Sequence, residues 1–392
     1  MSGPACVVFH DTMCSYDFGP SHPMSPLRVQ LAMRLARELG VIGPDALPQV
    51  DAEPASDDLL CTVHDRAYVA AVRAITGPDD LDLEHGLGTE DNPTFAGMHD
   101  ASAHVVGATV AAANRVWSGD VVHAANIAGG LHHGMRDHAS GFCIYNDVAV
   151  GIQSLLDAGA ERVAYVDVDV HHGDGVQEIF YDDPRVLTVS LHETPGTLFP
   201  GTGHASEIGG PGAPGSAVNV ALPPGTGDAG WLRAFAAVVP PALRAFEPQV
   251  LVSQHGCDTH MDDPLAHLML SIEGQRASYL ALHDLAHELC GGRWVATGGG
   301  GYAVTSVVPR AWTHLLAVVG GAPLDPKQEL PATWRADVER LTGRSTPQRL
   351  GDGRSTAYRD FSSGYDPADW LDRAIMATRT AAFPHLGLDP HH

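Results

Sequence analysis

Short β-rich runs alternate with helical stretches along most of the chain, and this order constrains the fold more than any other feature. The β-rich runs lie at 121–125, 163–170, 186–191, 250–253 and 294–297. Several of them are apolar without alternation, which is typical of parallel strands covered on both faces. Strands that alternate with helices predict a doubly wound α/β sheet.

The helical stretches are expected near 65–76, 100–117, 148–158, 229–246 and 275–290. An earlier helix has the clearest boundaries, because Ser25 can cap it, Pro26 suits its first turn and Gly40 suits its end. Leucines recur within it at helical spacing, at Leu27, Leu31, Leu35 and Leu39. Glycine and proline predict loops between 200 and 230, around a short β-rich run at 217–222.

The pattern weakens after about residue 320. We expect residues 1–320 to form one large domain, and residues 321–392 to form a polar extension that packs on it, with a helix near 367–380. A chain of 392 residues has about the right length for one large α/β domain or for two modest ones.

The formal net charge is −24 at pH 7. We expect no nucleic-acid partner, because phosphate would be repelled and no run of Lys and Arg offers a basic patch. The same charge would attract a cationic substrate or serve solubility alone, and both interpretations stay open.

No apolar run approaches the length of a membrane span, so we expect no membrane partner. The first ten residues lack a basic patch that leads into an apolar stretch, so we expect no signal peptide and a cytoplasmic location. The six cysteines form no CxxC pair, which argues against a disulfide framework or a Cys-rich zinc site.

Histidine, aspartate and tyrosine side chains follow four of the expected strands, at the point where each strand ends. These are His132 and His133, the segment 167–174, Asp258, and Tyr302 after four glycines. Ligands of open α/β sheets bind beyond the carboxyl ends of the strands. The sequence therefore predicts that these side chains meet at one edge of the sheet.

Two carboxylates in the second of these segments point to a cation. Asp167 and Asp169 are two residues apart on an expected strand, so their side chains leave the same face. Buried carboxylates so close together repel each other unless a cation lies between them. A carboxylate, the imidazole of His171 and the carboxylate of Asp258 would form an open three-ligand site, which is typical of catalytic zinc. A salt-bridged strand end is the alternative, but the segment has no Lys or Arg.

Carboxylates elsewhere in the motifs could orient the two adjacent histidines. Asp167 and Asp174 could orient His132 and His133, one carboxylate for each ring, which fixes the tautomer and raises basicity. A general base for a metal-bound water needs this arrangement. Tyr302 could present its hydroxyl to an oxyanion, or could simply pack in a glycine-rich turn.

Six motifs stand in the following order: HPMSPLR at 22–28, GLHH at 130–133, SGFCIYND at 140–147, DVDVHHGDG at 167–175, FPGTG at 199–203 and GGGGY at 298–302. From about residue 9 to about residue 316 the chain resembles the zinc-dependent histone deacetylase family. GLGTEDNP at 86–93 adds a resemblance to the bacterial acetoin-utilisation branch and to class I deacetylases. The resemblance implies a single-domain, three-layer α/β fold with a mostly parallel central sheet, shared with arginases, and a deacetylase catalytic domain over residues 1–320.

The resemblance also assigns roles to individual residues. Three of them would bind zinc, or alternatively ferrous iron: Asp169, His171 and Asp258. An acid/base pair, its supporting carboxylates and a carbonyl-polarising hydroxyl would complete the catalytic set: His132, His133, Asp167, Asp174 and Tyr302. A structural potassium or sodium ion would occupy an inner site at Asp167, Asp169, His171, Ser190 and Leu191, and another an outer site at Phe180, Asp183 and Val186.

The substrate would enter through a tunnel in this scheme. Phe142 and Phe199 would line it, and Gly141 would leave room for the lysine methylenes. The rim and the inner end would take three further residues: Leu265 at the rim, Asp91 as acceptor for the substrate backbone, and Arg28 near an inner acetate pocket.

The expected activity is hydrolysis of the acetyl amide of N-ε-acetyl-lysine in proteins, by metal-activated water with a histidine base and a tyrosine donor. An acetylpolyamine amidohydrolase is the alternative, because the negative charge suits a small acetylated amine, whereas Asp91 favours peptides. The intact histidine pair and Tyr302 speak against a non-catalytic reader of acyl-lysine. An arginase-like enzyme with two manganese ions fits the histidine pair and GGGGY poorly.

Overall fold

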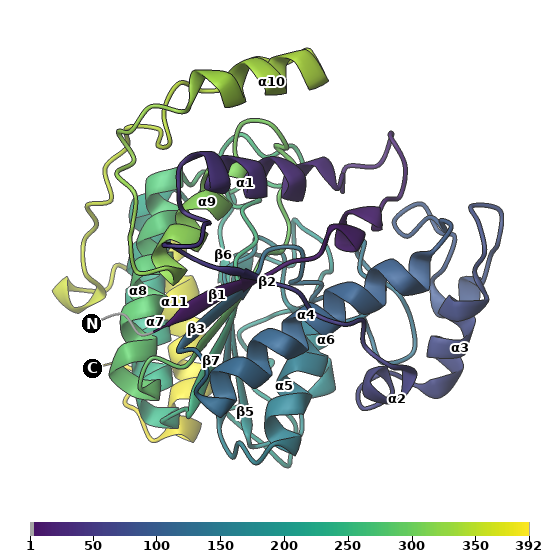
Figure 1. Ribbon diagram of the computed structural model, residues 1–392. Helices are drawn as coiled ribbons and strands as arrows, with labels where there is room; N and C mark the ends of the chain where they lie inside the picture. Colours follow the sequence, from purple (N-terminus) through teal and green to yellow (C-terminus); the bar gives the residue numbers. More distant parts are fainter. Residues whose placement is uncertain (1–3, 392) are drawn as a thin grey trace.

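The computed structural model describes residues 4–391, and a parallel sheet runs through the middle of this part of the chain (Figure 1). Its strands are β1 (Ala5–Val8), β2 (Gln49–Val50), β3 (His123–Asn126), β4 (Val163–Asp167), β5 (Val186–Glu193), β6 (Ala217–Leu222), β7 (Val250–Gln254) and β8 (Trp294–Thr297). The order within this eight-stranded sheet is β2-β1-β3-β8-β7-β4-β5-β6, and every described neighbouring pair is parallel. The expected α/β class is confirmed.

Helices cover both faces of the sheet. Their bounds are α1 (Leu27–Glu38), α2 (Asp57–Leu60), α3 (Arg66–Ala74), α4 (Met98–Ser118), α5 (Asp147–Asp157), α6 (Asp174–Ile179), α7 (Asp228–Phe246), α8 (Ile272–Cys290), α9 (Val308–Val319), α10 (Ala332–Thr342) and α11 (Trp370–Ala382), with 3-10 turns η1 (Asp11–Ser15), η2 (Leu83–His85), η3 (Phe361–Ser363) and η4 (Phe383–Leu386). Helices α4, α5 and α6 lie on one face, and α7, α8, α9 and α11 lie on the other (Figure 1). Between residues 4 and 391, no helix combines the length and the apolar character that crossing a bilayer requires.

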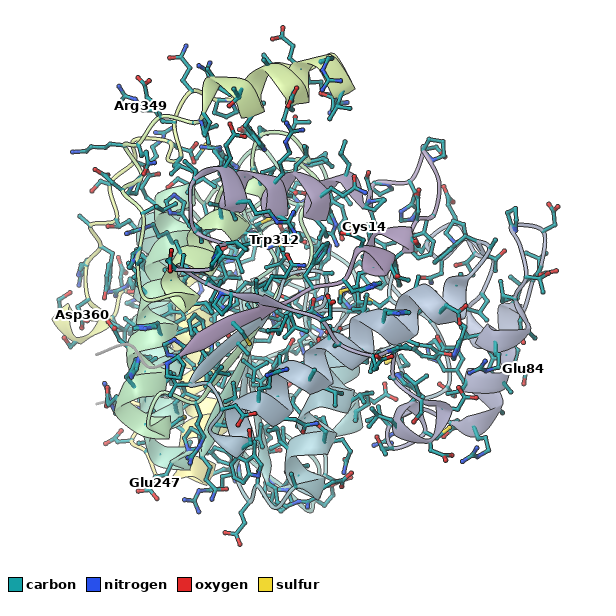
Figure 2. The ribbon with its side chains drawn as sticks, in the orientation of Figure 1. Cys14, Glu84, Glu247, Trp312, Arg349 and Asp360 are labelled. Atoms are coloured by element: carbon teal, nitrogen blue, oxygen red, sulfur yellow. The ribbon has the colours of Figure 1, made fainter. Side chains whose placement is uncertain are left out.

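The central strands are buried along their whole length, as their unbroken apolar runs require. Every residue of β3, β4, β5, β7 and β8 is buried. Trp312 of α9 lies in the interior, whereas Glu84, Glu247, Arg349 and Asp360 lie at the periphery (Figure 2). A sheet covered on both faces leaves its strand ends as the place where polar side chains can gather.

The structure differs from the sequence expectations at several elements, and the short helices α2, α6 and α10 are among those that were not expected. β1 and β2 were not expected, because runs of four and two residues carry too little pattern. α9 was also missed, and all of its residues are buried, including its polar residues Arg310, Thr313 and His314. The strand expected at 163–170 is β4, and it ends at Asp167. The backbone N–H of Asp169 donates to the Asp167 carboxylate instead of to a neighbouring strand.

The segment beyond residue 320 packs against the rest of the chain at several places. α10 lies on α1, where a separate apolar cluster forms from Leu31, Leu35, Leu330, Trp334, Val338 and Leu350. α11 packs on α7 and β6, and Asp372 pairs there with buried Arg233 at 2.7 Å. The leucine stripe of α1 therefore serves the C-terminal segment as well as the main core.

Asp352 connects the same segment to the main core through hydrogen bonds. We predict that Asp352→Asn lowers the free energy of unfolding by about 2–3 kcal/mol, because these bonds are weakened. Its carboxylate accepts hydrogen bonds from Arg310 Nη1 (2.8 Å), His260 Nε2 (2.9 Å) and the backbone N–H of Ile272 (2.8 Å). Burial would raise the pKa of Asp352, but the hydrogen bond from His260 and the charge of Arg310 hold it well below its ordinary value.

Urea denaturation tests this prediction. The difference between wild type and Asp352→Asn should be complete at neutral pH and should shrink as the pH falls below about 4, because the stabilising form is the ionised carboxylate. Asp79→Asn, which changes an exposed carboxylate, is the control and should leave the unfolding midpoint unchanged. Equal midpoints for wild type and Asp352→Asn would show that these contacts do not hold the segment.

Candidate metal and catalytic site

The four strands that precede the predicted site residues are neighbours in the sheet. β3, β8, β7 and β4 lie side by side in that order. Because they are parallel, their carboxyl ends meet at one edge, and His132, His133, Asp169, His171 and Tyr302 line a common narrow pocket of about 20 Å³ there. The structure therefore brings together side chains that lie up to 170 positions apart in the chain.

Asp169, His171 and Asp258 form a buried metal-binding triad. Each offers one ligand atom, and these atoms lie within 4.8 Å of one another. His171 Nδ1 is 3.1 Å from Asp169 Oδ1 and 3.2 Å from Asp258 Oδ2. Within residues 4–391, the ion pairs recorded for these two carboxylates all involve histidine, so the salt-bridged alternative is absent.

The backbone around the triad is shaped to keep both carboxylates in place. A Cβ at Gly256 would lie 1.8 Å from Asp169 Oδ2, and one at Gly300 would lie 1.9 Å from Asp258 Oδ2. Gln254 Nε2 and the N–H of Gly300 donate to Asp169 Oδ2 at 2.7 and 2.8 Å. These donors are neutral, so they orient the carboxylates without cancelling the charge, and the donor set fits a divalent cation.

The pocket concentrates negative potential. Burial and the nearby charge of Asp169 raise the pKa of Asp258 to about 6. Burial also acts against a charged His171, yet its hydrogen bonds with Asp169 and Asp258 raise the pKa of that imidazole to about 10. Both shifts have the same cause, which is a pair of buried carboxylates that attracts positive charge.

His132 and His133 lie beside the triad, and each is oriented by its own carboxylate. The Nδ1–H of His132 donates to Asp167 Oδ2 at 2.7 Å, and the Nδ1–H of His133 donates to Asp174 Oδ1 at 2.6 Å. The two Nε2 atoms are 3.1 Å apart. Both rings therefore turn their Nε2 atoms toward the site, as the pairing expected from the sequence requires.

The two imidazoles differ in charge. Burial disfavours a charged His132, but Asp167 and Asp169 raise its pKa to about 9. Burial and the positive charge of His132 lower the pKa of His133 to about 4. The pair thus holds one protonated and one neutral ring, and a pair of titratable groups with such separated pKa values is typical of an acid/base site.

Tyr302 also lines the pocket. Its backbone N–H donates to Asp263 Oδ2 at 2.8 Å, and its ring meets Phe142 edge-on at 5.8 Å between centroids. Burial raises the pKa of Tyr302 well above its ordinary value, so the phenol keeps its proton and remains a donor. Arg28 lies at the inner end, where its Nη1 donates to Gly299 O at 2.8 Å.

Two aromatic rings and one glycine lie next to residues that line the pocket. Gly141 has a φ of 51°, and a Cβ there would lie 2.5 Å from the His133 ring and 2.9 Å from the Phe199 ring. Phe142 also has a positive φ, 69°, and its carbonyl accepts a hydrogen bond from Tyr16 at 2.7 Å. Phe199 is 43% exposed, with its ring 5.0 Å from that of His133. The Phe142 ring therefore lies against Tyr302, and the Phe199 ring lies against His133.

The remaining predicted positions lie farther out or on neighbouring strands. Leu265 is 36% exposed, and Asp91 is also exposed. Ser190 stands beside Asp167 in the β4–β5 register. The other positions named for monovalent cations are Leu191 in β5 and Phe180, Asp183 and Val186 around the turn from α6 to β5, where the Asp183 carboxylate pairs with Arg185.

Three polar residues of the site were not identified from the sequence. Tyr165 donates to Asp167 Oδ2 at 2.6 Å, Gln254 donates to Asp169, and Asp263 holds the backbone of Tyr302. Strand alternation could have indicated Tyr165, because it lies two residues before Asp167 on the same face. Gln254 ends β7 and contacts Asp169 beyond β4, and Asp263 contacts the loop of Tyr302, so no local spacing in the sequence indicates these contacts.

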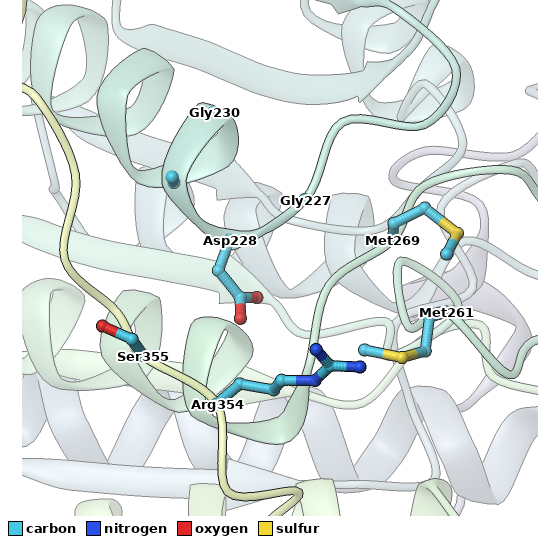
Figure 3. Close-up of a pocket in the computed structure, with 8 residues that line it drawn as sticks. Gly227, Asp228, Gly230, Met261, Met269, Arg354 and Ser355 are labelled. Carbon is cyan, nitrogen blue, oxygen red and sulfur yellow. The ribbon is translucent and has the colours of Figure 1, made fainter.

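A larger hollow of about 450 Å³ lies elsewhere on the molecule, but it lacks this chemistry. Asp228 and Arg354 point into it, with Met261 and Met269 on another side (Figure 3). None of the residues predicted for the site lines this hollow. The donor set, not the volume, therefore identifies the candidate site.

Comparisons with known proteins agree with this geometry. Residues 22–319 match the histone deacetylase domain. The chain is 43% identical over 349 residues to the acetoin utilization protein AcuC of Bacillus subtilis, covering 88% of this chain and 89% of that protein. It is 36% identical over 354 residues to AcuC of Staphylococcus aureus strain MSSA476, covering 90% of each.

Solved structures give the same result. The crystal structure of a histone deacetylase homologue from Aquifex aeolicus superposes with a TM-score of 0.82 at 28% identity, covering 96% of this chain and all of that one. The HD domain of HDA15 superposes with a TM-score of 0.77 at 26% identity, covering 98% of each. The chain therefore belongs to the histone deacetylase family. It is an amidohydrolase of that family, of the acetoin-utilisation type, with a buried Asp-His-Asp metal site.

We predict that Asp258→Asn and Asp258→Ala lower the bound metal by about one ion per chain, because two ligands cannot hold a divalent ion as three do. Elemental analysis of protein dialysed against trace zinc measures this. Asp262→Ala, which changes an exposed carboxylate four residues away, should keep its metal. Unchanged metal content in both Asp258 variants would remove Asp258 from the ligand set.

Proposed function

We propose that this protein is a zinc-dependent lysine deacetylase, which hydrolyses the acetyl amide of N-ε-acetyl-lysine in other proteins. One observation carries the proposal. The triad, the carboxylate-oriented histidine pair and Tyr302 meet at one pocket, and the rings of Phe142 and Phe199 lie against Tyr302 and His133. A reader of acyl-lysine would need the entrance but not two imidazoles held with their Nε2 atoms toward a metal site.

Asp169, His171 and Asp258 would hold the ion, zinc or alternatively ferrous iron. When bound, such an ion lowers the pKa of a coordinated water toward about 7 and polarises an amide carbonyl. His133 is neutral and lies nearer the entrance, so its Nε2 would accept the proton of the attacking water. The same nitrogen would then deliver this proton to the leaving lysine amine.

The other polar groups would stabilise the charge that develops. His132, protonated and 3.1 Å from the Nε2 of His133, supplies positive charge beside the reacting centre, with Asp167 and Asp174 holding the two rings. The Tyr302 hydroxyl would donate to the oxyanion formed from the acetyl carbonyl. A donor of this kind contributes about 3–4 kcal/mol to transition-state stabilisation.

The substrate side chain would run between Phe142 and Phe199. The methylenes of lysine are apolar and fit between two aromatic rings, and Gly141 keeps the passage open. Leu265 and Asp91 would meet the substrate backbone at the rim, where both are exposed. Arg28 would line the inner end, where acetate is released.

We extend the proposal to structural cations, domain limits and location. Potassium or sodium would bind an inner site of Asp167, Asp169, His171, Ser190 and Leu191, and an outer site of Phe180, Asp183 and Val186. Residues 1–320 would form the catalytic domain, with residues 321–392 as an extension that packs on it. The six cysteines are free thiols within residues 4–391, which supports a reducing compartment such as the cytoplasm.

We predict that Tyr302→Phe lowers kcat on an acetyl-lysine peptide by about 100- to 1000-fold, because the oxyanion loses a donor. The variant should bind as much metal as wild type, since Tyr302 is not a ligand. A fluorogenic peptide assay with metal analysis of the same sample measures both quantities. Tyr358→Phe, which changes an exposed tyrosine, is the matched control. A parental rate for Tyr302→Phe would contradict the assignment.

An acetylpolyamine amidohydrolase is the second candidate, favoured by the net charge of −24 and the narrow pocket. We predict that Asp91→Ala lowers kcat/KM for an acetyl-lysine peptide by about 10-fold or more, through lost hydrogen bonds to the substrate backbone. Turnover of acetylspermidine should not change. A panel of acyl-lysine peptides and acetylpolyamines decides between the two substrates. Binding without turnover of either would indicate a reader.

A further inference from the structure

A second group of potential metal ligands lies at the opposite edge of the sheet. His123 is the first residue of β3, whereas the catalytic residues follow the far ends of the parallel strands. His283 and His287 stand one turn apart on α8. The ligand nitrogens of the three histidines lie within 4.8 Å of one another. None of the roles assigned to the catalytic edge involves them.

Two of the imidazole nitrogens are buried without a partner. His123 Nδ1 is 2.9 Å from Val319 O, and a carbonyl can only accept, so Nδ1 carries the hydrogen. Its Nε2 is left with a free lone pair, and no hydrogen-bond partner for that atom occurs within residues 4–391. A buried acceptor in this state costs about 1–3 kcal/mol. A bound cation would remove this cost.

His283 repeats the arrangement. Its Nδ1 is 3.3 Å from the Asp284 carboxylate, which also can only accept. Its Nε2 is buried, again with no partner in the described part of the chain. A carboxylate on the far nitrogen fixes the tautomer, so that the other nitrogen keeps a lone pair for a ligand, as in many histidine–metal sites.

His287 completes the group and opens it to solvent. It is exposed, and its spacing of four residues from His283 places both rings on one face of α8, a spacing common in zinc-binding helices. The three ring centroids are 4.6 to 5.0 Å apart. Burial lowers the pKa of His123 to about 4 and also lowers that of His287.

We propose that His123, His283 and His287 bind one Zn²⁺ ion, at a site distinct from the catalytic one. Three imidazoles suit zinc, copper and nickel, and zinc is the metal to which we commit. Zn–N distances of about 2.0–2.1 Å require nitrogens about 3.4 Å apart, so small ring rotations would close the site. The ion would join β3 to α8 and leave its fourth position facing solvent, on the side of His287.

Metal counting in a catalytic-site variant tests this proposal. After dialysis against micromolar free Zn²⁺, wild type should hold two zinc ions per chain, and Asp258→Ala should hold one. His287→Ala should also hold one, and Asp258→Ala combined with His287→Ala should hold none. Because His287 is exposed, its replacement should leave the fold intact, and the circular dichroism spectrum checks this. His385→Ala, another exposed histidine, should keep two ions.

Thermal melting provides a second readout that does not depend on activity. Added Zn²⁺ should raise the Tm of Asp258→Ala but not that of the variant that also lacks His287. Two zinc ions in His287→Ala, or none in Asp258→Ala, would overturn the proposal. Failure of the catalytic assignment gives a different result, since Asp258→Ala would then hold as much zinc as wild type.

Discussion

Two buried carboxylates that face one imidazole are the constraint on which the rest of this structure depends. Asp169 and Asp258 lie fully buried, and their hydrogen-bond donors apart from His171 are neutral amides. Such a pair is stable only with a cation between or beside it. The close-packed glycines and the loop that carries Tyr302 keep the carboxylates in that position, so the local fold serves one electrostatic arrangement.

The parallel sheet makes this arrangement possible. β4 and β7 are neighbours, and adjacent strands lie about 4.8 Å apart, so residues that follow their carboxyl ends come within ligand distance. β3 and β8 continue the same edge and supply the histidine pair and Tyr302. The helical layers bury the sheet on both faces and leave only the strand ends for chemistry.

The histidine cluster at the start of β3 is oriented in the same way as the catalytic histidines, through a hydrogen bond on the nitrogen that faces away from the cluster. His123 is held by a carbonyl on one nitrogen, much as His132 and His133 are held by carboxylates. In each case the far partner fixes the tautomer and leaves the other nitrogen directed into a cluster. The two clusters differ in their ligand groups, since one contains carboxylates and the other only imidazoles.

The sequence by itself determined the α/β class, most of the strands and the identity of the residues at the catalytic edge, because local spacing carries this information. The acids and histidines from Asp167 to Asp174 are close in sequence, so they follow the end of β4 whatever the rest of the chain does. Only the tertiary structure decided the partners of Gln254 and Asp263, the burial of α9, the packing of α10 on α1 and the meeting of His123 with α8. Each of these contacts joins segments that are distant in sequence. The hydrophobic periodicity of a segment indicates its local structure but not the distant surface against which its side chains pack.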